Sequence, residues 1–205
     1  MGHRLPFLMP SFKIMTQDLQ HIILQSDRLS LRPVARDDAD WICVRSNDYD
    51  IAKMTLSIPY PQTRDNVLQF LQECKEQAAA GTDHVYAIIS AQPCGLIGFA
   101  DIEGETAELG YWLSRTSWGH GYATEAAKTI VSFGFQSLGL KKITAGHFFD
   151  NPASGRVLEK LGFYYTGEVC NLACKARKTT VKCKQMVLHH EEWRKQIMHD
   201  NNSSA

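Results

Sequence analysis

The sequence predicts one α+β domain, in which a mixed β-sheet carries helices on both of its faces. Its 205 residues, of which 44% are apolar and 10% aromatic, are enough to bury a single core. Runs with the alternation of strands and runs with the spacing of helices follow one another in the order βααβββαβαββ. No internal repeat and no low-complexity linker divides the chain, so one domain is expected.

The first half of the chain is expected to contain one strand, two helices and then three strands. Residues 28–33 alternate leucine with polar residues and end at a proline, which is typical of a first strand. Aspartates within residues 37–40 favour the first turn of a helix. Thr63 is predicted to cap a second helix, which Gly81 ends. Short connectors then join three strand-like runs, over residues 85–90, 96–102 and 107–113.

In the second half, helices and strands are expected to alternate. Gly139 is predicted to close a long helix, and Asn151 as N-cap with Pro152 at the first helical position predicts the start of a shorter one. The basic, polar stretch 175–184 is expected to be a solvated loop between the last two strands. The predicted helices cover residues 123–138 and 152–161, and the predicted strands cover residues 142–148, 163–169 and 182–189.

Both ends of the chain are expected to lie outside the domain, which is predicted over residues 21–198. Residues 1–20 show no clean period and contain two prolines, so they are predicted to form an N-terminal extension. Their apolar stretch is short, broken by proline and followed by no convincing cleavage site, which argues against a signal peptide. Residues 199–205 are expected to form a C-terminal tail.

Composition excludes several classes of partner. Lys plus Arg and Asp plus Glu both count 22, so no overall field favours binding to nucleic acid or to an anionic membrane. No run approaches the ~20 apolar residues of a membrane span. The six cysteines are scattered rather than set in a dense framework, which favours reduced thiols in a cytoplasmic protein.

A glycine turn between a strand and a helix is the most informative segment. Gly119 and Gly121 permit positive φ and a close approach of the backbone to a ligand, and the start of the helix directs free N–H groups outward. This pattern predicts an anion site, to which Thr124 and His120 can add donors, although an ordinary turn would look the same. A Rossmann motif would need a third glycine and an earlier position in the chain, and the Gly-Lys-Ser/Thr of a P-loop is missing.

Four stretches of this sequence resemble the GNAT family of N-acetyltransferases, and most closely its RimJ/RimL type of ribosomal-protein N-terminal acetyltransferases. The resemblance runs from Asp27 to about Trp193. It implies a single splayed sheet with acetyl-CoA as acyl donor, the pantetheine arm lying between the strand that ends at Leu113 and the strand that ends near Phe148. The four stretches are residues 27–33, 59–63, 110–126 and 151–163.

The resemblance also implies which residues bind the donor. The pyrophosphate is expected on the glycine turn, and no metal is expected. Trp118 stands where the family usually has Gln or Arg, and His120 where Lys or Arg is more common. The expected cofactor-binding residues are Leu113, Ser114, Trp118, Gly119, His120, Gly121, Tyr122, Ala123, Thr124 and Asn151.

Acetyl transfer to an amine needs a base, donors aimed at the oxyanion and a donor for the leaving thiolate. Glu108 is the candidate base, with a pKa raised in its cleft, although a strand glutamate is often only solvated or ion-paired. The resemblance implies the backbone N–H of Leu113 as oxyanion donor. Many GNAT enzymes present a tyrosine to the thiolate where this chain has Leu158, so Ser154 is the substitute candidate, unless it merely supports the helix.

The acceptor side has fewer candidates. Tyr60 matches a region that walls the amine pocket in the related enzymes, although a loop aromatic can equally be packing. The spacing of Cys170, Cys174, Cys183 and His189 is too irregular to predict a zinc site. The aromatic residues Tyr111, Phe133 and Phe135 are expected in the core.

Two functions are compatible with these residues. The first is transfer of an acetyl group from acetyl-CoA to a primary amine, either a protein N-terminus or a small molecule, by direct attack in a ternary complex; a homodimer is left open. The alternative is a catalytically inactive CoA-binding regulatory protein, supported only by Leu158. A nicotinamide-dependent oxidoreductase is excluded because no βαβ unit precedes the glycines.

Overall fold

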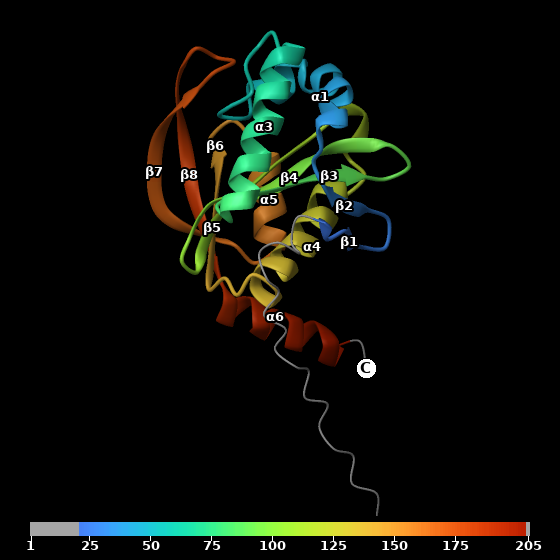
Figure 1. The fold of residues 1–205 in the computed structure, drawn as a ribbon. Coiled ribbons are helices and arrows are strands. Elements are labelled where there is room, and N and C mark those ends of the chain that lie inside the picture. The colour runs from blue at the N-terminus through green and yellow to red at the C-terminus, as the bar shows by residue number, and fades with distance from the viewer. Residues whose placement is uncertain (1–20, 204–205) are drawn as a thin grey trace, which may run out of the picture.

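The computed structural model describes residues 21–203 and shows one mixed sheet of eight strands (Figure 1). The order across the sheet is β1-β2-β3-β4-β5-β6-β8-β7, and only the pair β5–β6 is parallel. The expected extension over residues 1–20 lies outside the described residues. The strands are β1 Leu24–Gln25, β2 Ser30–Pro33, β3 His84–Ile89, β4 Pro93–Glu103, β5 Thr106–Leu113, β6 Lys142–Phe148, β7 Tyr164–Cys174 and β8 Thr179–His189.

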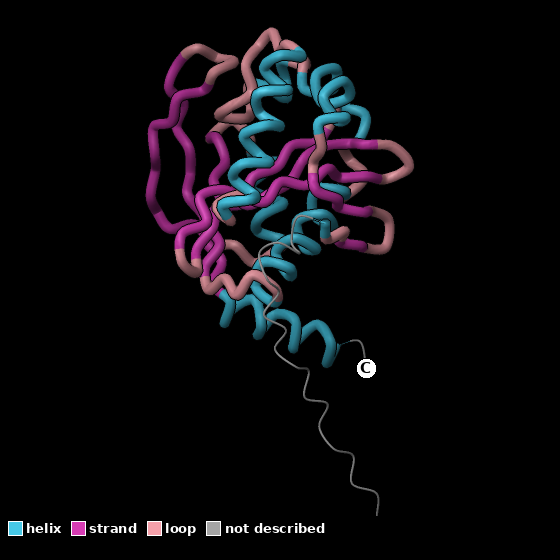
Figure 2. The backbone as a smooth tube through the Cα atoms, in the orientation of Figure 1, coloured by secondary structure: helices cyan, strands magenta, loops and turns pink. Residues whose placement is uncertain are grey.

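Helices cover both faces of the sheet, which confirms the predicted fold class (Figure 2). The helices α1 and α3 pack on one face, where Ile42 and Leu71 meet Leu96 of β4. On the opposite face lie α4 and α5. The helices are α1 Ala39–Ser46, α2 Tyr49–Ala52, α3 Arg64–Ala80, α4 Tyr122–Gln136, α5 Pro152–Lys160 and α6 His190–Ser203, with 3-10 turns at Arg36–Asp38 and Arg115–Ser117.

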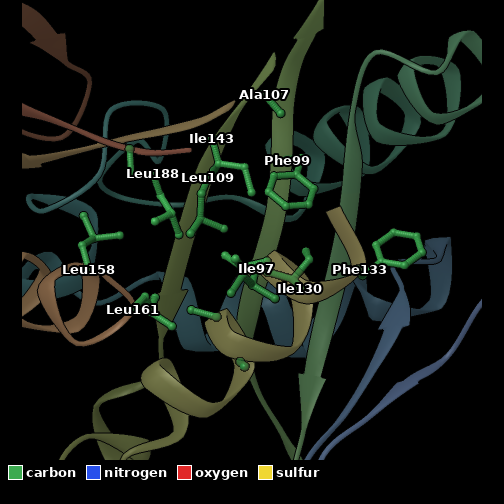
Figure 3. Close-up of a cluster of buried hydrophobic side chains, with 14 of the residues drawn as sticks. Ile97, Phe99, Ala107, Leu109, Ile130, Phe133, Ile143, Leu158, Leu161 and Leu188 are labelled. Atoms are coloured by element: carbon green, nitrogen blue, oxygen red, sulfur yellow. The ribbon is translucent and has the colours of Figure 1, made fainter. Parts of the chain in front are cut away.

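The main core lies between the sheet and the α4–α5 layer. Ile97 and Phe99 from β4, Ile130 from α4 and Leu158 from α5 belong to one cluster of buried side chains (Figure 3). Because these residues come from strands and helices far apart in the sequence, burying their apolar surface fixes the layers against one another.

The caps predicted at Thr63, Gly81 and Asn151 are confirmed, whereas Gly139, which was expected to close α4, lies beyond the C-cap Ser137 of that helix. The Thr63 side chain accepts a hydrogen bond from the Asn66 N–H at 3.2 Å, and Gly81 closes α3 with a φ of 75°. Asn151 accepts from the Ser154 N–H at 3.3 Å at the start of α5. Each of these caps depends on residues a few positions apart in the sequence, so it can be predicted without knowledge of the tertiary structure.

The predicted order was wrong in three elements, because it lacked β1, α2 and α6. The first two are very short, with two and four residues. The third, α6, extends across residues 199–203 of the expected tail, and its anchor is Trp193, which packs on Phe135 with ring centroids 5.2 Å apart. So few apolar residues leave no clear helical stripe in the sequence.

The expected loop over residues 175–184 was also wrong. The strands β7 and β8 continue to Cys174 and from Thr179, so only residues 175–178 form the turn. Most of β7 is exposed, at the edge of the sheet. Polar and apolar residues alike are exposed along it, among them Tyr164, Tyr165 and Val169, so its sequence lacks the regular alternation from which a half-buried strand is predicted.

A buried carboxylate ties β2 to α1. Asp38 is 3% exposed and accepts two hydrogen bonds from Arg32, at 2.6 and 2.8 Å. It also accepts from the Trp41 indole N–H at 2.6 Å and from the Ala35 N–H at 2.8 Å. Burial alone would raise the pKa of Asp38, but these donors outweigh it and lower the pKa.

We expect Asp38→Asn to lower the free energy of unfolding by roughly 3 kcal/mol at pH 7, because it leaves the Arg32 guanidinium without its charge partner. A lowered carboxyl pKa contributes stability above its unfolded value, and that contribution is lost as the pH falls through the folded value. The difference between wild type and variant should therefore shrink below about pH 4 in urea titrations. The exposed neighbour Asp37→Asn is the control, and an equal loss there would contradict the prediction.

Candidate active site

The sheet opens between β5 and β6, as predicted. These strands pair only at Thr106↔Lys142, Ala107↔Ile143 and Glu108↔Thr144. Beyond Glu108, β5 stays paired with β4 and β6 stays paired with β8. The two central strands therefore diverge into a V, along which their facing backbone groups lack partners in the ladder.

Every second amide of β5 faces this V. The Ala107 carbonyl accepts from the Thr144 hydroxyl of β6 at 3.3 Å, while the Ser114 N–H donates to the Cys94 carbonyl on the β4 side at 2.8 Å. Because the register between β4 and β5 has no shift from Glu108 to Leu113 and peptide directions alternate, the N–H groups of Tyr111 and Leu113 point into the V. The Leu113 carbonyl accepts from the Trp118 indole N–H at 2.9 Å.

The glycine turn has the backbone that the sequence predicted. Gly119 and Gly121 have φ values of 78° and 79°, in the left-handed region that favours glycine. Gly121 is the N-cap of α4, and its carbonyl accepts from the Glu125 N–H at 3.1 Å. The three preceding N–H groups of the helix start have no acceptor within the helix, so they are available to an anion.

Two side chains of the turn fold back onto it. The His120 ring lies 2.8 Å from the Trp118 carbonyl through Nδ1 and stacks on Tyr122 with centroids 5.5 Å apart. Ser114 is buried and shares a hydrogen bond of 3.0 Å with Ser117. The His120 Nδ1 and the Ser114 hydroxyl therefore have partners close by, whereas the main-chain N–H groups at the start of α4 have none within the helix.

Arg28, just before β2, contacts the glycine turn and the start of α4. This role of Arg28 was not predicted from the sequence. Its guanidinium contacts the Glu125 carboxylate at 2.6 and 2.7 Å, donates to the His120 carbonyl at 3.1 Å and lies 5.1 Å from the Tyr122 ring centroid. Partial burial would raise the pKa of Glu125, but donors from Ser26 and Arg28 lower it. An acidic residue in the first turn of α4 was the only signal of this contact in the sequence.

Where the V opens, α5 contacts both of its arms. The Ser154 Oγ lies 2.9 Å from the hydroxyl of Tyr111, on β5. The next residue, Gly155, packs on His147 of β6, where an added Cβ would lie 2.8 Å from Nε2. Phe133 and Phe135 are buried in the core as expected. Tyr111, also expected there, is partly buried and packs against the main core, while its hydroxyl contacts Ser154.

Leu158 offers no group to the V. It is fully buried in the main core, one turn of α5 after Ser154. A hydrogen-bond donor for this site therefore has to come from the first turn of α5 or from β5.

Glu108 occupies the face of the sheet that α1 and α3 cover. The residue is exposed. Trp112, four residues further along β5 and on the same face, packs on Trp41 of α1 with ring centroids 6.4 Å apart. Although the residue as a whole is exposed, protein atoms around the carboxyl group reduce its solvation; this desolvation, followed by repulsion from Asp101, raises the pKa of Glu108. The direction agrees with the expectation for a base.

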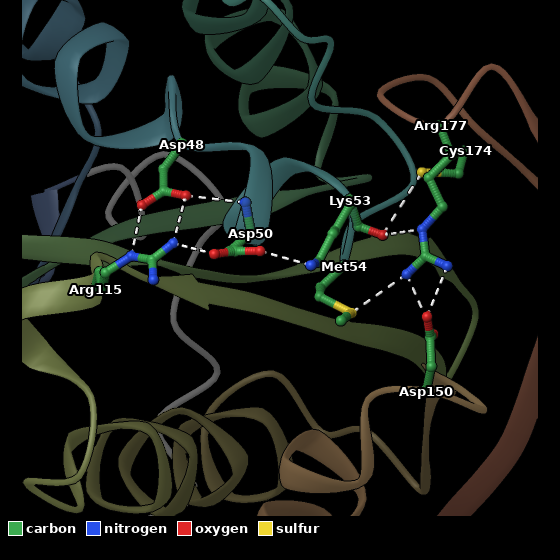
Figure 4. A network of polar contacts seen from close by, with 8 residues as sticks. All are labelled: Asp48, Asp50, Lys53, Met54, Arg115, Asp150, Cys174 and Arg177. Carbon is green, nitrogen blue, oxygen red and sulfur yellow. Dashed lines mark hydrogen bonds and ion pairs between the residues drawn. The ribbon is translucent and has the colours of Figure 1, made fainter.

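A short segment around α2 spans the open end of the V (Figure 4). On the β5 side, Arg115 donates to Asp48 at 2.9 and 3.0 Å and pairs with Asp50. On the β6 side, Arg177 donates to the Lys53 carbonyl at 2.6 Å. It also donates twice to Asp150, just after β6. Sequence reasoning did not predict this segment, which we call the strap, Asp48–Lys53.

Tyr60 lies beside the strap. Its ring is 5.2 Å from that of Tyr49, and 41% of the residue is exposed. Both rings line a pocket of about 580 Å³, together with Asp48, Ser114 and Arg115. A hollow of similar volume between β1 and α4 lies away from the V and holds no candidate site residue.

The described residues contain no cluster of three histidine, cysteine or carboxylate side chains arranged for a metal ion. Across the same part of the chain, no helix combines the length and apolar character needed to cross a membrane.

We expect Arg28→Ala to loosen the start of α4, because Glu125 and the His120 carbonyl lose their common partner. Hydrogen exchange of the Glu125 amide, which is bonded to Gly121, should accelerate roughly fivefold. Arg64→Ala, which removes an exposed ion pair with Asp40, is the matched control. Unchanged exchange at Glu125 in the Arg28 variant would show that the turn needs no brace.

Comparisons with known proteins agree with this architecture. A family model described as an acetyltransferase (GNAT) domain matches residues 28–164. The uncharacterized N-acetyltransferase p20 of Bacillus licheniformis is 32% identical over 149 residues, which cover 70% of this chain and 83% of that protein.

Solved structures share the fold. RimL, a ribosomal L7/L12 alpha-N-protein acetyltransferase in complex with coenzyme A, has a TM-score of 0.75 at 17% identity, covering 82% of this chain and 98% of its own. Spermidine N-acetyltransferase from Vibrio cholerae, in complex with CoA and spermine, has a TM-score of 0.69 at 20% identity, covering 82% and 99%. With the family match over more than half of its length, the chain belongs to the GNAT family of acetyltransferases.

Proposed function

We propose that this acetyltransferase moves the acetyl group of acetyl-CoA to a primary amine by direct attack in a ternary complex. The observation that carries the proposal is the V between β5 and β6, which has a glycine turn with open N–H groups at one end and a carboxylate with a raised pKa at the other. The solved structures of RimL and of the spermidine acetyltransferase both hold CoA, which supports the same donor here.

The main chain supplies most of the proposed donor site. The N–H groups from Gly119 to Thr124 would hold the pyrophosphate, since the helix start adds a partial positive charge. Amides of β5 that face the V would pair with the pantetheine arm as a neighbouring strand does, and Asn151 lies at the same opening. Trp118 contributes by fixing the Leu113 carbonyl at the end of β5.

Two backbone amides are suited to stabilise the oxyanion, those of Leu113 and Tyr111. Both point into the V, and a main-chain donor held by a sheet needs no reorganisation during the reaction. Because Ser154 contacts Tyr111, we place the leaving sulfur beside Tyr111 along β5 rather than beside Leu113. An amine attacking there lies about 10 Å along the strand from Glu108, whereas one at Leu113 lies about 16 Å away.

Glu108 is therefore proposed as a base that acts through water. Either distance exceeds the reach of one glutamate side chain, and the exposed carboxylate can receive the amine proton by way of solvent in the groove. Its raised pKa makes it a better proton acceptor than an ordinary carboxylate.

Ser154 is proposed to donate a hydrogen bond to the sulfur as the C–S bond breaks. Ser154 is half-buried at the opening of the V. Leu158, which stands where many GNAT enzymes have a tyrosine, is fully buried in the core. The proton that the amine nitrogen loses balances the charge of the thiolate, so Ser154 need not give up its own proton.

The acceptor is proposed to enter from the α1–α3 face, past the strap and Tyr60. The names of the relatives cover both a protein N-terminus and a polyamine as acceptors. In the strap, Asp48 and Asp50 are already paired with Arg115, so they offer less attraction to a polycation than free carboxylates would. This pairing favours a singly charged amine such as a peptide N-terminus.

The direct test is thiol release from acetyl-CoA with peptides, amino acids and spermidine, read together with mass spectrometry of the acetylated product. Turnover on at least one amine is expected. CoA binding without turnover on any amine would favour the inactive regulatory protein instead.

We expect Glu108→Gln to lower kcat/KM on the order of 100-fold, because the base can no longer accept a proton. Glu108 must be deprotonated to act and its pKa is raised, so wild-type activity should fall on acidification at a pH above the ordinary glutamate value of about 4.3. This acidic limb should be missing from the variant with the same amine. Glu103→Gln, at the exposed end of β4, is the control and should keep the limb.

Gly119→Ala should raise the Kd for CoA on the order of tenfold, because an alanine at a φ of 78° disturbs the N–H groups of the turn. Gly139→Ala is matched to it, since Gly139 has a φ of 72° and open space around its Cβ position as well. Both variants should lose about 1 kcal/mol of stability. Equal Kd values for the two variants would remove the turn from the cofactor site.

A further inference from the structure

The hydroxyl of Tyr111 meets the proposed thiolate donor. It lies 2.9 Å from the Ser154 Oγ and 3.2 Å from the Ser154 carbonyl oxygen. We infer that Tyr111 is a positioning residue, which orients the Ser154 hydroxyl toward the leaving sulfur; this inference rests on the proposed acetyl transfer.

The available hydrogen bonds leave Ser154 with two arrangements. A serine hydroxyl has one proton and a tyrosine hydroxyl has one proton. When Tyr111 donates to the Ser154 carbonyl, the Ser154 Oγ can donate to Tyr111, and the serine proton is then not available to the sulfur. When Tyr111 donates to the Ser154 Oγ instead, the serine proton is free for the sulfur. Negative charge developing on sulfur favours the second arrangement.

The backbone of Ser154 is held independently of this exchange. Its N–H donates to Asn151 Oδ1 at 3.3 Å, within the cap of α5. The helix turn is therefore fixed while the two hydroxyl protons reorient, so the switch needs only rotation about C–O bonds. Such small motions are fast compared with turnover.

Tyr111 does not serve as the acid itself. Burial raises its pKa to about 12, although the hydrogen bond with Ser154 lowers it in part. The proton of Tyr111 is therefore held more tightly than that of an ordinary tyrosine, which makes Tyr111 a poorer proton donor to the leaving thiolate. Tyr111 therefore keeps its proton and acts through the direction of the Ser154 hydroxyl.

Tyr86 provides a matched control within the same protein. It is 1% exposed, lies on β3, and its ring contacts Phe133 of α4 at a centroid distance of 6.2 Å. Its hydroxyl has no hydrogen-bond partner among the described residues. Removing that oxygen changes a buried tyrosine without breaking a hydrogen bond.

The experiment compares Tyr111→Phe, Tyr86→Phe, Ser154→Ala and the double variant Tyr111→Phe/Ser154→Ala with wild type, using an amine that wild type acetylates. We expect Tyr111→Phe to lower kcat about tenfold, with KM for acetyl-CoA changed less than about twofold. The Tyr86 variant should match wild type. In the Ser154→Ala background, the Tyr111 substitution should change kcat less than about twofold, because its effect passes through Ser154.

Three outcomes overturn the inference. A wild-type kcat in Tyr111→Phe would show that the hydroxyl has no role. An equal tenfold loss in the Ser154→Ala background would show that Tyr111 acts by another route. A rise in KM with unchanged kcat would make it a binding residue. Failure of the proposed function is distinct, because wild type itself would then acetylate no amine.

Discussion

The divergence of β5 from β6 is the constraint on which the rest of the structure depends. Three residue pairs hold these parallel strands together, after which each strand keeps only its outer neighbour. A sheet that opens in its middle leaves backbone donors and acceptors without partners, a cost that a globular protein normally avoids. The open edge is therefore suited to a ligand with amides of its own, as in the donor site proposed above.

The surrounding elements keep this opening in shape from three sides. At the end of β5, Arg28 and Glu125 hold the glycine turn against β2, while the Trp118 indole holds the last carbonyl of the strand. From below, α5 contacts both arms through consecutive residues. Across the open end, Arg115 and Arg177 anchor the strap. Exposed ion pairs are individually weak, but here they act on backbone already placed by the core.

The two faces of the sheet divide the chemistry. Side chains alternate along β5, so Glu108 faces the α1–α3 layer while Tyr111 reaches the α5 layer, and their shared strand carries the amides of the V between them. The proposed base and the proposed thiolate donor thus approach the reacting carbonyl from opposite sides. In direct transfer the amine adds to one face of the thioester carbonyl carbon while the sulfur starts in the plane of that carbonyl, so a base and a thiolate donor on different sides of β5 can each serve a different atom.

The sequence by itself determined the features that depend on neighbours along the chain: the caps at Thr63 and Asn151, the positive φ of Gly119 and Gly121, and the alternation that places Glu108. Only the tertiary structure decided the contacts that complete the site. Tyr111 meets Ser154 across 43 positions, Arg115 meets Asp48 across 67, and Arg28 meets Glu125 across 97. Periodicity and turn chemistry describe a few consecutive residues, whereas such pairs arise from the packing of layers that bury one common core.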